Sequence, residues 1–238
     1  MGDRAQKGLP PPAPPAERTA GQLVAESMRL YGRRIWIALL IGVPPTLAGL
    51  ALAAASDSTT SRAAELTLAL ALGAPAVSLS YVGASVLAAD SRPPARSLVV
   101  AFVAGLLVLL PVPFLATLLF LPALAWFALF GLAVPVAVVE RLGLAAALRR
   151  ALQLARADYV HALGSLAAAA IVVLVSAGVL QFLLVQFSET ASGVAAFIAI
   201  LLLSPLLLFA AALLYDDQVA RAAPVREGLT TPRPRRGR

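Results

Sequence analysis

Cysteine is absent from this chain of 238 residues, and histidine occurs once, as His161. Disulfide bonds and thiolate metal sites are therefore excluded. A metal site built from several histidine and cysteine ligands is excluded as well, whereas a site made of carboxylates alone is left open. We accordingly predict no cofactor and no metal site.

Charge is also scarce. Charged side chains make up 13% of the chain and hydrophobic ones 60%, whereas soluble domains carry about 25% charged residues. Lys7 is the only lysine among 19 basic residues. This excess of arginine, together with abundant alanine, is typical of a GC-rich bacterial genome. We therefore expect a bacterial integral membrane protein.

The net charge of +7 raises the question of nucleic-acid binding. However, the basic residues flank the apolar runs, where the positive-inside rule already places them. Aromatic residues make up only 6% of the chain and do not alternate with basic ones, as a base-stacking surface requires. We predict no nucleic-acid partner.

Five apolar stretches are long enough to cross a membrane, which takes about 20 residues. They cover residues 35–54, 66–89, 97–139, 160–185 and 194–214. The third has 43 residues without a charge and would measure about 65 Å as one helix, twice the thickness of a bilayer core. It must fold back once, and the prolines that mark where it can turn are Pro111, Pro113 and Pro122. The predicted fold class is all-α: a polytopic membrane protein with six transmembrane helices plus short amphipathic interfacial helices.

Arginine alternates between the segments that connect the six spans. The N-terminal segment, the second and fourth loops and the C-terminal segment together hold every basic residue except Arg62. Because cytoplasmic segments are enriched in basic residues, we place all four on the inner side of a bacterial plasma membrane, with both termini in the cytoplasm. The chain divides into a disordered proline-rich tail (1–20), a six-helix membrane domain (21–219) and a basic tail (220–238).

The first apolar stretch has a competing interpretation as a cleaved signal peptide. Arg33 and Arg34 precede it, and the small residues Ala53 and Ala55 lie at its end. Its length of about 20 residues, the double proline beginning at Pro44 and the 34 preceding residues favour a retained anchor. Cleavage would leave five spans.

Residues 21–34 predict a short amphipathic helix before the first span. Val24, Met28 and Tyr31 fall on one helical face, and polar and charged residues fall on the other. Such a helix can lie at the inner membrane interface and lead into the first span.

The loop after the fourth span predicts a second amphipathic helix. Its apolar face is formed by Leu144, Leu148, Leu152 and Ala155. Arg149 and Arg156 lie on the other face, with Arg150 beside them. On the inner leaflet these three arginines would meet lipid phosphates, at roughly 1 kcal/mol each. We hypothesise that they bind lipid headgroups; the alternative is that they only orient the helix.

Acidic residues lie at the predicted inner ends of two spans. Glu140 ends the fourth span and can form an interfacial ion pair with Arg149 or Arg150. Asp216 and Asp217 are adjacent, and the side chains of adjacent helical residues diverge by about 100°. A cation site at these two aspartates is therefore disfavoured.

The stretch VPVAVVERLGLAAALRRALQLARADYVHALGSL resembles the signature segment of a six-helix membrane domain that is attached to some bacterial glycerophosphoryl diester phosphodiesterases and also occurs alone. The matching positions are Pro135, Glu140, Gly143, Ala147, Leu148, Arg150 and Tyr159. After the sixth span, Tyr215, Asp216 and Arg221 match the Tyr-Asp-Arg pattern of that family. Arg141 stands where the family has glycine, and Ala151 where it has serine.

This resemblance spans roughly residues 21–229 and implies a stand-alone membrane module. Glu140, Tyr215, Asp216 and Arg221 would be its structural or interfacial residues. Phosphodiesterase activity is not implied, because that chemistry belongs to a separate soluble barrel of about 250 residues. The His-Glu metal motif of that barrel is missing from this chain.

No predicted span has an acidic or basic residue at its centre, which argues against an ion-coupled pump. His161, near the start of the fifth span, is expected to be an interfacial hydrogen-bonding residue. We favour a non-enzymatic scaffold or lipid-interacting module whose partners are membrane lipids; a protein partner or a second copy of the chain is left open. One alternative is a carrier or exporter of an apolar or amphiphilic small molecule, with a cavity framed by proline kinks. The other is an intramembrane enzyme acting on lipid headgroups, which needs carboxylates near Glu140 and Asp216.

Overall fold

The computed structural model describes residues 14–56 and 61–223, which form helices and short connections with no strand among them. In chain order the α-helices are α1 (Ala20–Arg33), α2 (Ile35–Ser56), α3 (Arg62–Leu68), α4 (Ala74–Ala88), α5 (Ala95–Leu109), α6 (Val112–Leu118), α7 (Phe120–Phe130), α8 (Ala133–Val139), α9 (Leu144–Ala157), α10 (Tyr159–Val185) and α11 (Glu189–Ala222). A short 3-10 helix, η1 (Pro15–Glu17), precedes α1, and a π-helical turn, η2 (Ala69–Gly73), joins α3 to α4. The predicted all-α fold is confirmed.

Six helical segments of the described chain are long and apolar enough to cross a membrane, as predicted. They are Ile35–Ala55, Leu66–Ala88, Ala95–Thr117, Phe120–Val139, Tyr159–Val185 and Ser192–Ala222. The long third apolar stretch folds back at Leu119, which is extended between α6 and α7 with φ −164° and ψ 150°. This turn lies between Pro113 and Pro122, two of the prolines predicted to mark it.

Helical structure extends beyond the predicted limits of the spans. Leu214 is the last residue of the sixth predicted span, but α11 continues to Ala222. Its polar last turns stay helical because Asp217 and Arg221 form ion pairs with the N-terminal segment and the start of α10. Residues 14–19, assigned from the sequence to the proline-rich tail, pack against α11. Residues 1–13 and 224–238 of the predicted tails lie outside the described residues.

Prolines inside the spans leave backbone carbonyls without a helical partner, because proline has no N–H for the carbonyl four residues before it. In a membrane such a carbonyl must be satisfied by the protein itself. Pro45 lies within α2, and the carbonyl of Ile41 accepts a hydrogen bond from the Ser80 hydroxyl at 2.6 Å. A side chain of α4 thus replaces the N–H missing from α2.

The same compensation occurs where α7 gives way to α8. Pro135 provides no N–H for the carbonyl of Gly131, which lies at the break between these two helices. The hydroxyl of Tyr81, only 1% exposed, donates to this carbonyl at 3.0 Å. The backbone N–H of Val134 approaches the same oxygen at 3.4 Å. Successive residues of α4, Ser80 and Tyr81, therefore satisfy carbonyls that prolines leave without a partner in two other spans.

A third proline lies where two helices are in close contact. Pro205 is inside α11 and provides no N–H for the carbonyl of Leu201. Gly42 of α2 packs directly on that carbonyl, since a Cβ atom at this glycine would lie 2.2 Å from Leu201 O. Only glycine permits this approach, and it fixes α2 against α11.

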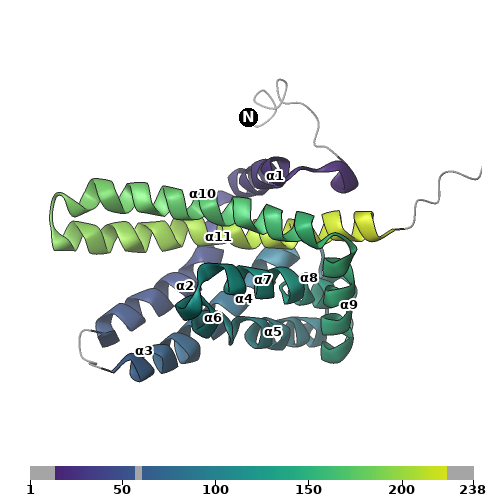
Figure 1. Cartoon of the computed structure of the whole chain (residues 1–238), viewed down its shortest axis with the longest axis horizontal. Coiled ribbons are helices and arrows are strands. Elements are labelled where there is room, and N and C mark those ends of the chain that lie inside the picture. Colours follow the sequence, from purple (N-terminus) through teal and green to yellow (C-terminus); the bar gives the residue numbers. More distant parts are fainter. Residues whose placement is uncertain (1–13, 57–60, 224–238) are drawn as a thin grey trace, which may run out of the picture.

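The helices surround one main core. In Figure 1 the α10–α11 hairpin runs along one side of the bundle, α2, α4, α5 and α7 lie beside it, and α9 crosses one end. The main buried cluster draws residues from both groups of helices and from α9: they include Tyr81, Val108, Leu154, Leu166 and Phe209. Because the core includes Leu154 of α9, this helix is held at the end of the bundle.

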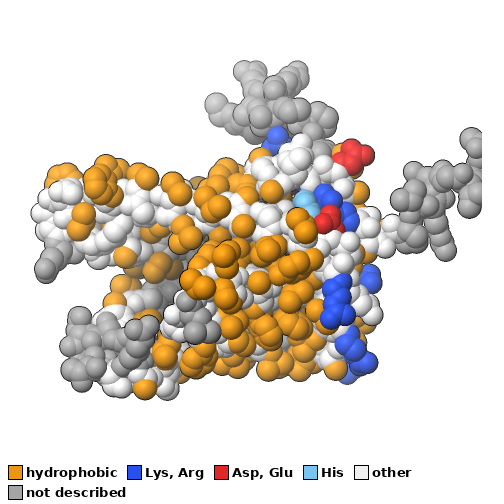
Figure 2. All heavy atoms as spheres, in the orientation of Figure 1, with side chains coloured by type: hydrophobic (Ala, Val, Ile, Leu, Met, Phe, Trp, Pro, Cys, Tyr) orange, Lys and Arg blue, Asp and Glu red, His pale blue; other side chains and the backbone are white. Residues whose placement is uncertain are grey.

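Apolar and charged side chains occupy different parts of the surface. Figure 2 shows apolar side chains along the flank and arginines at the end crossed by α9. We name this the arginine-rich end and define it by Arg96, Arg141, Arg149 and Arg156. The exposed flank carries large apolar side chains, which lipid tails can cover; they include Leu107, Ile171, Val175 and Phe182.

The first amphipathic helix packs on the protein. α1 lies alongside α10 and α11 (Figure 1), and the Tyr31 ring meets the Phe209 ring edge-on at 6.4 Å. Its buried residues are Leu23, Val24 and Ser27. The predicted apolar face is therefore only partly right, since Met28 is 48% exposed. Two helices cover α1, so its buried face extends to residues beside the predicted stripe.

Candidate functional site

Helix α9 places the predicted headgroup arginines at the arginine-rich end. It begins after Gly143 and ends before Asp158, whose side chain caps α10 by accepting a hydrogen bond from the His161 N–H at 3.1 Å. Its fully buried residues are Ala147, Ala151, Leu154 and Ala155. Of the predicted apolar face, Ala155 is buried but the three leucines are only partly so. The buried face of α9 includes these alanines for a steric reason: their small side chains let α9 approach the ends of α5 and α8 closely.

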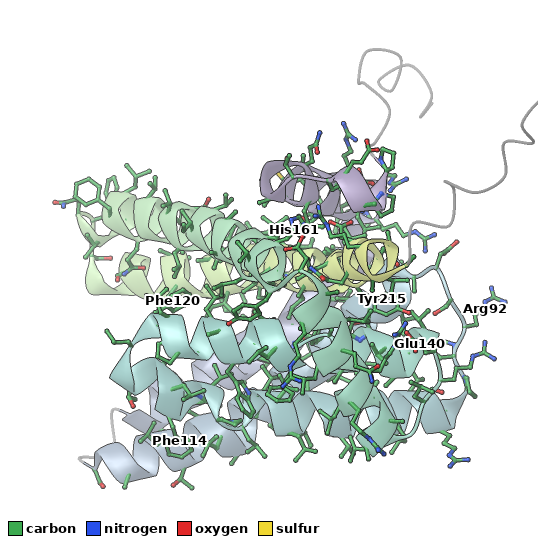
Figure 3. All side chains as sticks on the ribbon, turned by 45° about the vertical axis from the view of Figure 1, so that its right-hand side comes forward. Arg92, Phe114, Phe120, Glu140, His161 and Tyr215 are labelled. Carbon is green, nitrogen blue, oxygen red and sulfur yellow. The ribbon has the colours of Figure 1, made fainter. Side chains whose placement is uncertain are left out.

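Arg150 points toward the protein, where it forms an ion pair with Glu140. Its Nε lies 3.1 Å and 3.2 Å from the two carboxylate oxygens of Glu140. The Tyr215 hydroxyl donates to the same carboxylate at 3.1 Å. Figure 3 shows Glu140 and Tyr215 close together at this end, while Phe120 lies toward the opposite one. This cluster connects the end of α8 with α9 and α11; of the two partners predicted for Glu140, Arg149 or Arg150, it contains Arg150.

Arg149 and Arg156 point away from the protein. Both are exposed, and Arg149 donates to its own helix at the carbonyl of Ala145 at 3.2 Å. Neither forms an ion pair with a carboxylate of the described residues. The structure therefore divides the three predicted headgroup arginines into one internal residue and two outward ones.

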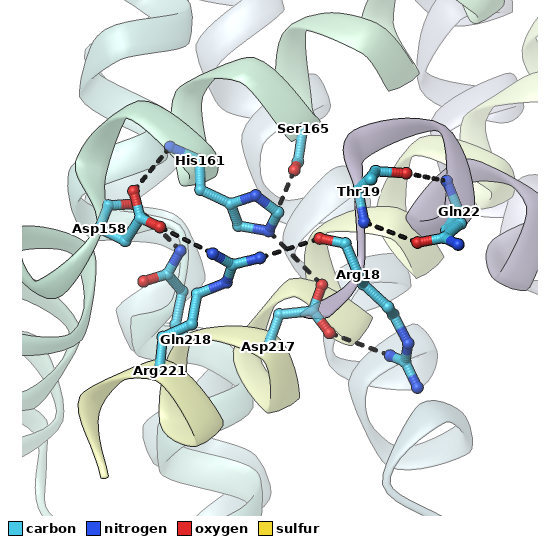
Figure 4. A network of polar contacts seen from close by, with 9 residues as sticks. All are labelled: Arg18, Thr19, Gln22, Asp158, His161, Ser165, Asp217, Gln218 and Arg221. Carbon is cyan, nitrogen blue, oxygen red and sulfur yellow. Dashed lines mark hydrogen bonds and ion pairs between the residues drawn. The ribbon is translucent and has the colours of Figure 1, made fainter. Parts of the chain in front are cut away.

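A second polar cluster lies where the N-terminal segment meets α10 and α11 (Figure 4). Asp217, with a fully buried side chain, accepts a hydrogen bond from Arg18 Nη1 at 3.0 Å. Its other oxygen is 3.6 Å from His161 Nε2, which also lies 3.4 Å from the Ser165 hydroxyl. This cluster buries a carboxylate and pairs it with an arginine from the beginning of the described chain.

Arg221 completes this second cluster. Its Nη1 lies 2.9 Å from Asp158 Oδ2, and its Nη2 donates to the backbone carbonyl of Arg18 at 2.9 Å. Gln218 donates to the carbonyl of Asp158 at 3.2 Å. Figure 4 shows that these side chains converge from α11, the α9–α10 junction and the segment before α1. The contacts hold the N-terminal segment against two spans.

The aspartate in this cluster is Asp217, which was not among the residues matched to the family pattern. Asp216, which matched the family pattern, is exposed, whereas the neighbouring Asp217 is buried. The two diverge, as expected for adjacent helical residues. The available signal was spacing: Asp217 and Arg221 are four residues apart and share a helical face. Arg221, identified from the same pattern, is part of the cluster.

The polar side chains of the two clusters bind mainly to one another and so connect parts of the fold. Both oxygens of Glu140 are bound by Arg150, and one also by Tyr215, so this carboxylate already has two partners. Within residues 14–56 and 61–223, no three His, Asp or Glu side chains gather in a way that would hold a metal ion. What the site presents to its surroundings is positive charge on α9 and on the neighbouring loops.

Comparisons of the chain with models of protein families, with curated proteins and with solved structures found no match.

Proposed function

We propose that this protein is a non-enzymatic membrane module that binds anionic lipid headgroups through α9 at the inner leaflet of a bacterial plasma membrane. One observation carries the proposal. α9 crosses the end of the bundle with its alanine face buried, and it exposes Arg149 and Arg156, which have no carboxylate partner in the described residues. Basic residues near an anionic leaflet contribute about 1 kcal/mol each. Headgroup phosphates are the anions available at that depth.

The inner-leaflet orientation rests on the distribution of arginine. Arg92, Arg96, Arg141 and Arg149 belong to the segments that connect spans at the same end of the bundle, which favours a cytoplasmic location for that end. Single cysteines test this directly, because the chain has none. An impermeant maleimide added to intact cells should label cysteine at Ser188 and leave cysteine at Ala145 unlabelled. Labelling at 145 would place α9 outside the cell and reject the proposal.

Membership of the six-helix family that resembles this chain is part of the proposal. Arg141 occupies a position at which that family has glycine, and its φ of +56° lies in the left-handed region that glycine adopts most easily. The backbone at this loop therefore has the conformation that a glycine there would favour, which supports the resemblance.

A carrier of apolar molecules remains the second candidate, because one apolar pocket lies on the side of the bundle. It has a volume of about 160 Å³ and lies between α2 and the α3–η2–α4 segment, where Pro45, Gly49, Leu52 and Gly73 line it. The space at the bundle centre, beside Tyr81, has no room for a water molecule. A carrier would therefore have to open the bundle or use this lateral pocket.

Lipid titration tests the proposed function. Purified protein in neutral detergent should gain thermal stability from phosphatidylglycerol but much less from phosphatidylcholine. The double variant R149Q/R156Q should lose most of that difference, whereas the charge-matched R33Q/R92Q, outside α9, should keep it. Equal stabilisation by both lipids, or equal losses in both double variants, would contradict headgroup binding by α9.

A further inference from the structure

A polar pocket opens beside α9 at the arginine-rich end. Its volume is about 300 Å³, and it lies between the first turn of α5 and the loop that joins α8 to α9. α5 contributes Arg96, Ser97 and Val100, and the loop contributes Arg141 and Gly143. The pocket is large enough for a phosphate group with its substituents, because its volume is many times the roughly 30 Å³ that one water molecule occupies in the liquid.

The charge that lines this pocket is of one sign. Among the described residues, Arg96 and Arg141 are the only charged ones that line it, and none of its lining residues there is an aspartate or a glutamate. Within the described residues neither arginine forms an ion pair or a side-chain hydrogen bond. At the same end Arg150, by contrast, forms an ion pair with Glu140. Two guanidinium groups without acidic partners can bind a phosphate through several charge-assisted hydrogen bonds.

The backbone adds to this positive potential. α5 begins after Pro94 and α9 after Gly143, and neither helix has a side-chain cap at its start. The first turn of a helix carries a partial positive charge from its free N–H groups. Both helix starts border the pocket, so their dipoles favour an anion placed between Arg96 and Arg141.

The face of α5 that extends from the pocket is apolar and exposed. Val99, Leu107 and Leu110 are 62%, 43% and 40% exposed. They lie three, eleven and fourteen residues after Arg96, which places all four on one helical face. An anion-binding residue is thus followed along the helix by an apolar stripe. A molecule with a phosphate head and an acyl tail has the same order of a charged part followed by an apolar part.

We propose that the pocket between α5 and the α8–α9 loop is a binding site for a phosphate ester, with Arg96 and Arg141 as its ligands. The apolar stripe of α5 identifies a phospholipid, whose acyl chain lies along Val99 and Leu107, as the expected source of the phosphate. This inference rests on the proposed function and adds to it a single defined site, distinct from the surface contacts of Arg149 and Arg156.

The test uses the full chain, delipidated in neutral detergent, with phosphatidylglycerol and inorganic phosphate as separate probes. Native mass spectrometry should detect one tightly retained phosphatidylglycerol for each chain. R96Q and R141Q should each weaken its retention about tenfold, as expected for one charge-assisted contact. R92Q removes a nearby charge outside the pocket and should leave retention unchanged.

Arg141→Gly separates binding from folding. Glycine relaxes a backbone with φ +56°, so the variant should melt at least as high as the wild type and yet lose the lipid. Retention of the lipid by R141G would overturn the role of the Arg141 side chain. Losses as large in R92Q as in R96Q would show that only overall charge matters and would likewise overturn the site.

The two probes identify the source of the phosphate. A phospholipid site is supported if R96Q loses the bound lipid and millimolar inorganic phosphate has little effect on the stability of the wild type. Phosphate that stabilises the wild type but not R96Q, without lipid retention, supports a site for a water-soluble phosphate. If R149Q/R156Q lowers stabilisation by lipid and R96Q has no effect, the pocket fails and the proposed function stands. If no variant alters any response, both fail.

Discussion

Replacing Tyr81 with phenylalanine removes one hydroxyl from the membrane interior and leaves the rest of the side chain in place. That hydroxyl donates at 3.0 Å to the carbonyl of Gly131, which Pro135 deprives of its helical N–H. No water reaches the site, because the Tyr81 side chain is 1% exposed within the core. The variant therefore leaves a buried carbonyl with only the long 3.4 Å contact from the Val134 N–H.

The expected cost follows from this geometry. A buried acceptor that loses its partner costs about 1–3 kcal/mol, and hydrogen bonds measured inside membrane proteins average about 0.6 kcal/mol. Because Val134 keeps a weak contact with Gly131, we expect Tyr81→Phe to lower the free energy of unfolding by about 1 kcal/mol. Reversible unfolding in mixed SDS and neutral-detergent micelles, followed by tryptophan fluorescence, measures this quantity.

A double-mutant cycle isolates the reason for the loss. Pro135→Ala restores an N–H four residues after Gly131, so the carbonyl can gain a backbone partner from α8. In that background Tyr81→Phe should cost about half as much, or less. Tyr31→Phe is the matched control, because the buried Tyr31 hydroxyl has no hydrogen-bond partner among the described residues and its removal should not destabilise the protein. Equal costs of Tyr81→Phe with and without Pro135 would refute the reasoning.

Two further changes test contacts that determine the arrangement of the spans, with the same unfolding assay. Gly42→Ala would place a Cβ atom 2.2 Å from Leu201 O and should cost about 1–3 kcal/mol; Gly164→Ala, with nothing within 4 Å, should be neutral or slightly stabilising. Arg18→Ala leaves the buried Asp217 carboxylate without its arginine and should cost about 3 kcal/mol, most of which adding Asp217→Asn should recover. A neutral Gly42→Ala, or no recovery in the Arg18/Asp217 pair, would contradict these contacts.

The spans could be predicted from the sequence because the bilayer sets their length. Each is a run of apolar residues near the 20 needed to cross, and the 43-residue run could fit only by folding back. The structure bends this run at Leu119, between two of the marked prolines. The end of α11 could not be predicted this way, because hydropathy stops at Leu214 whereas ion pairs keep the helix intact to Ala222.

The orientation of individual helices about their axes was harder to predict. A rotation of 100° distinguishes Asp216 from Asp217, and only packing against α10 and the N-terminal segment determines which one is buried. On α9, the hydrophobic pattern predicted a face made largely of leucines. The residues buried by close contact at the end of the bundle include Ala147 and Ala151 instead. The partners of Ile41 and Gly131 depended on how α4 packs, which no local pattern in the sequence states.

The ion pairs explain why the arginine-rich end keeps a surplus of positive charge. The carboxylates of Glu26, Asp90, Glu140, Asp158 and Asp217 each pair with an arginine in the described chain. The Glu140–Arg150, Asp158–Arg221 and Asp217–Arg18 pairs connect different elements of the fold, and all of the pairs neutralise the arginines that take part. The arginines left without an acidic partner there are Arg92, Arg96, Arg141, Arg149 and Arg156. All of them lie on the α4–α5 loop, the start of α5, the α8–α9 loop or α9 itself. The paired carboxylates thus connect parts of the fold, whereas Arg96, Arg141, Arg149 and Arg156 stay exposed and without an acidic partner among the described residues.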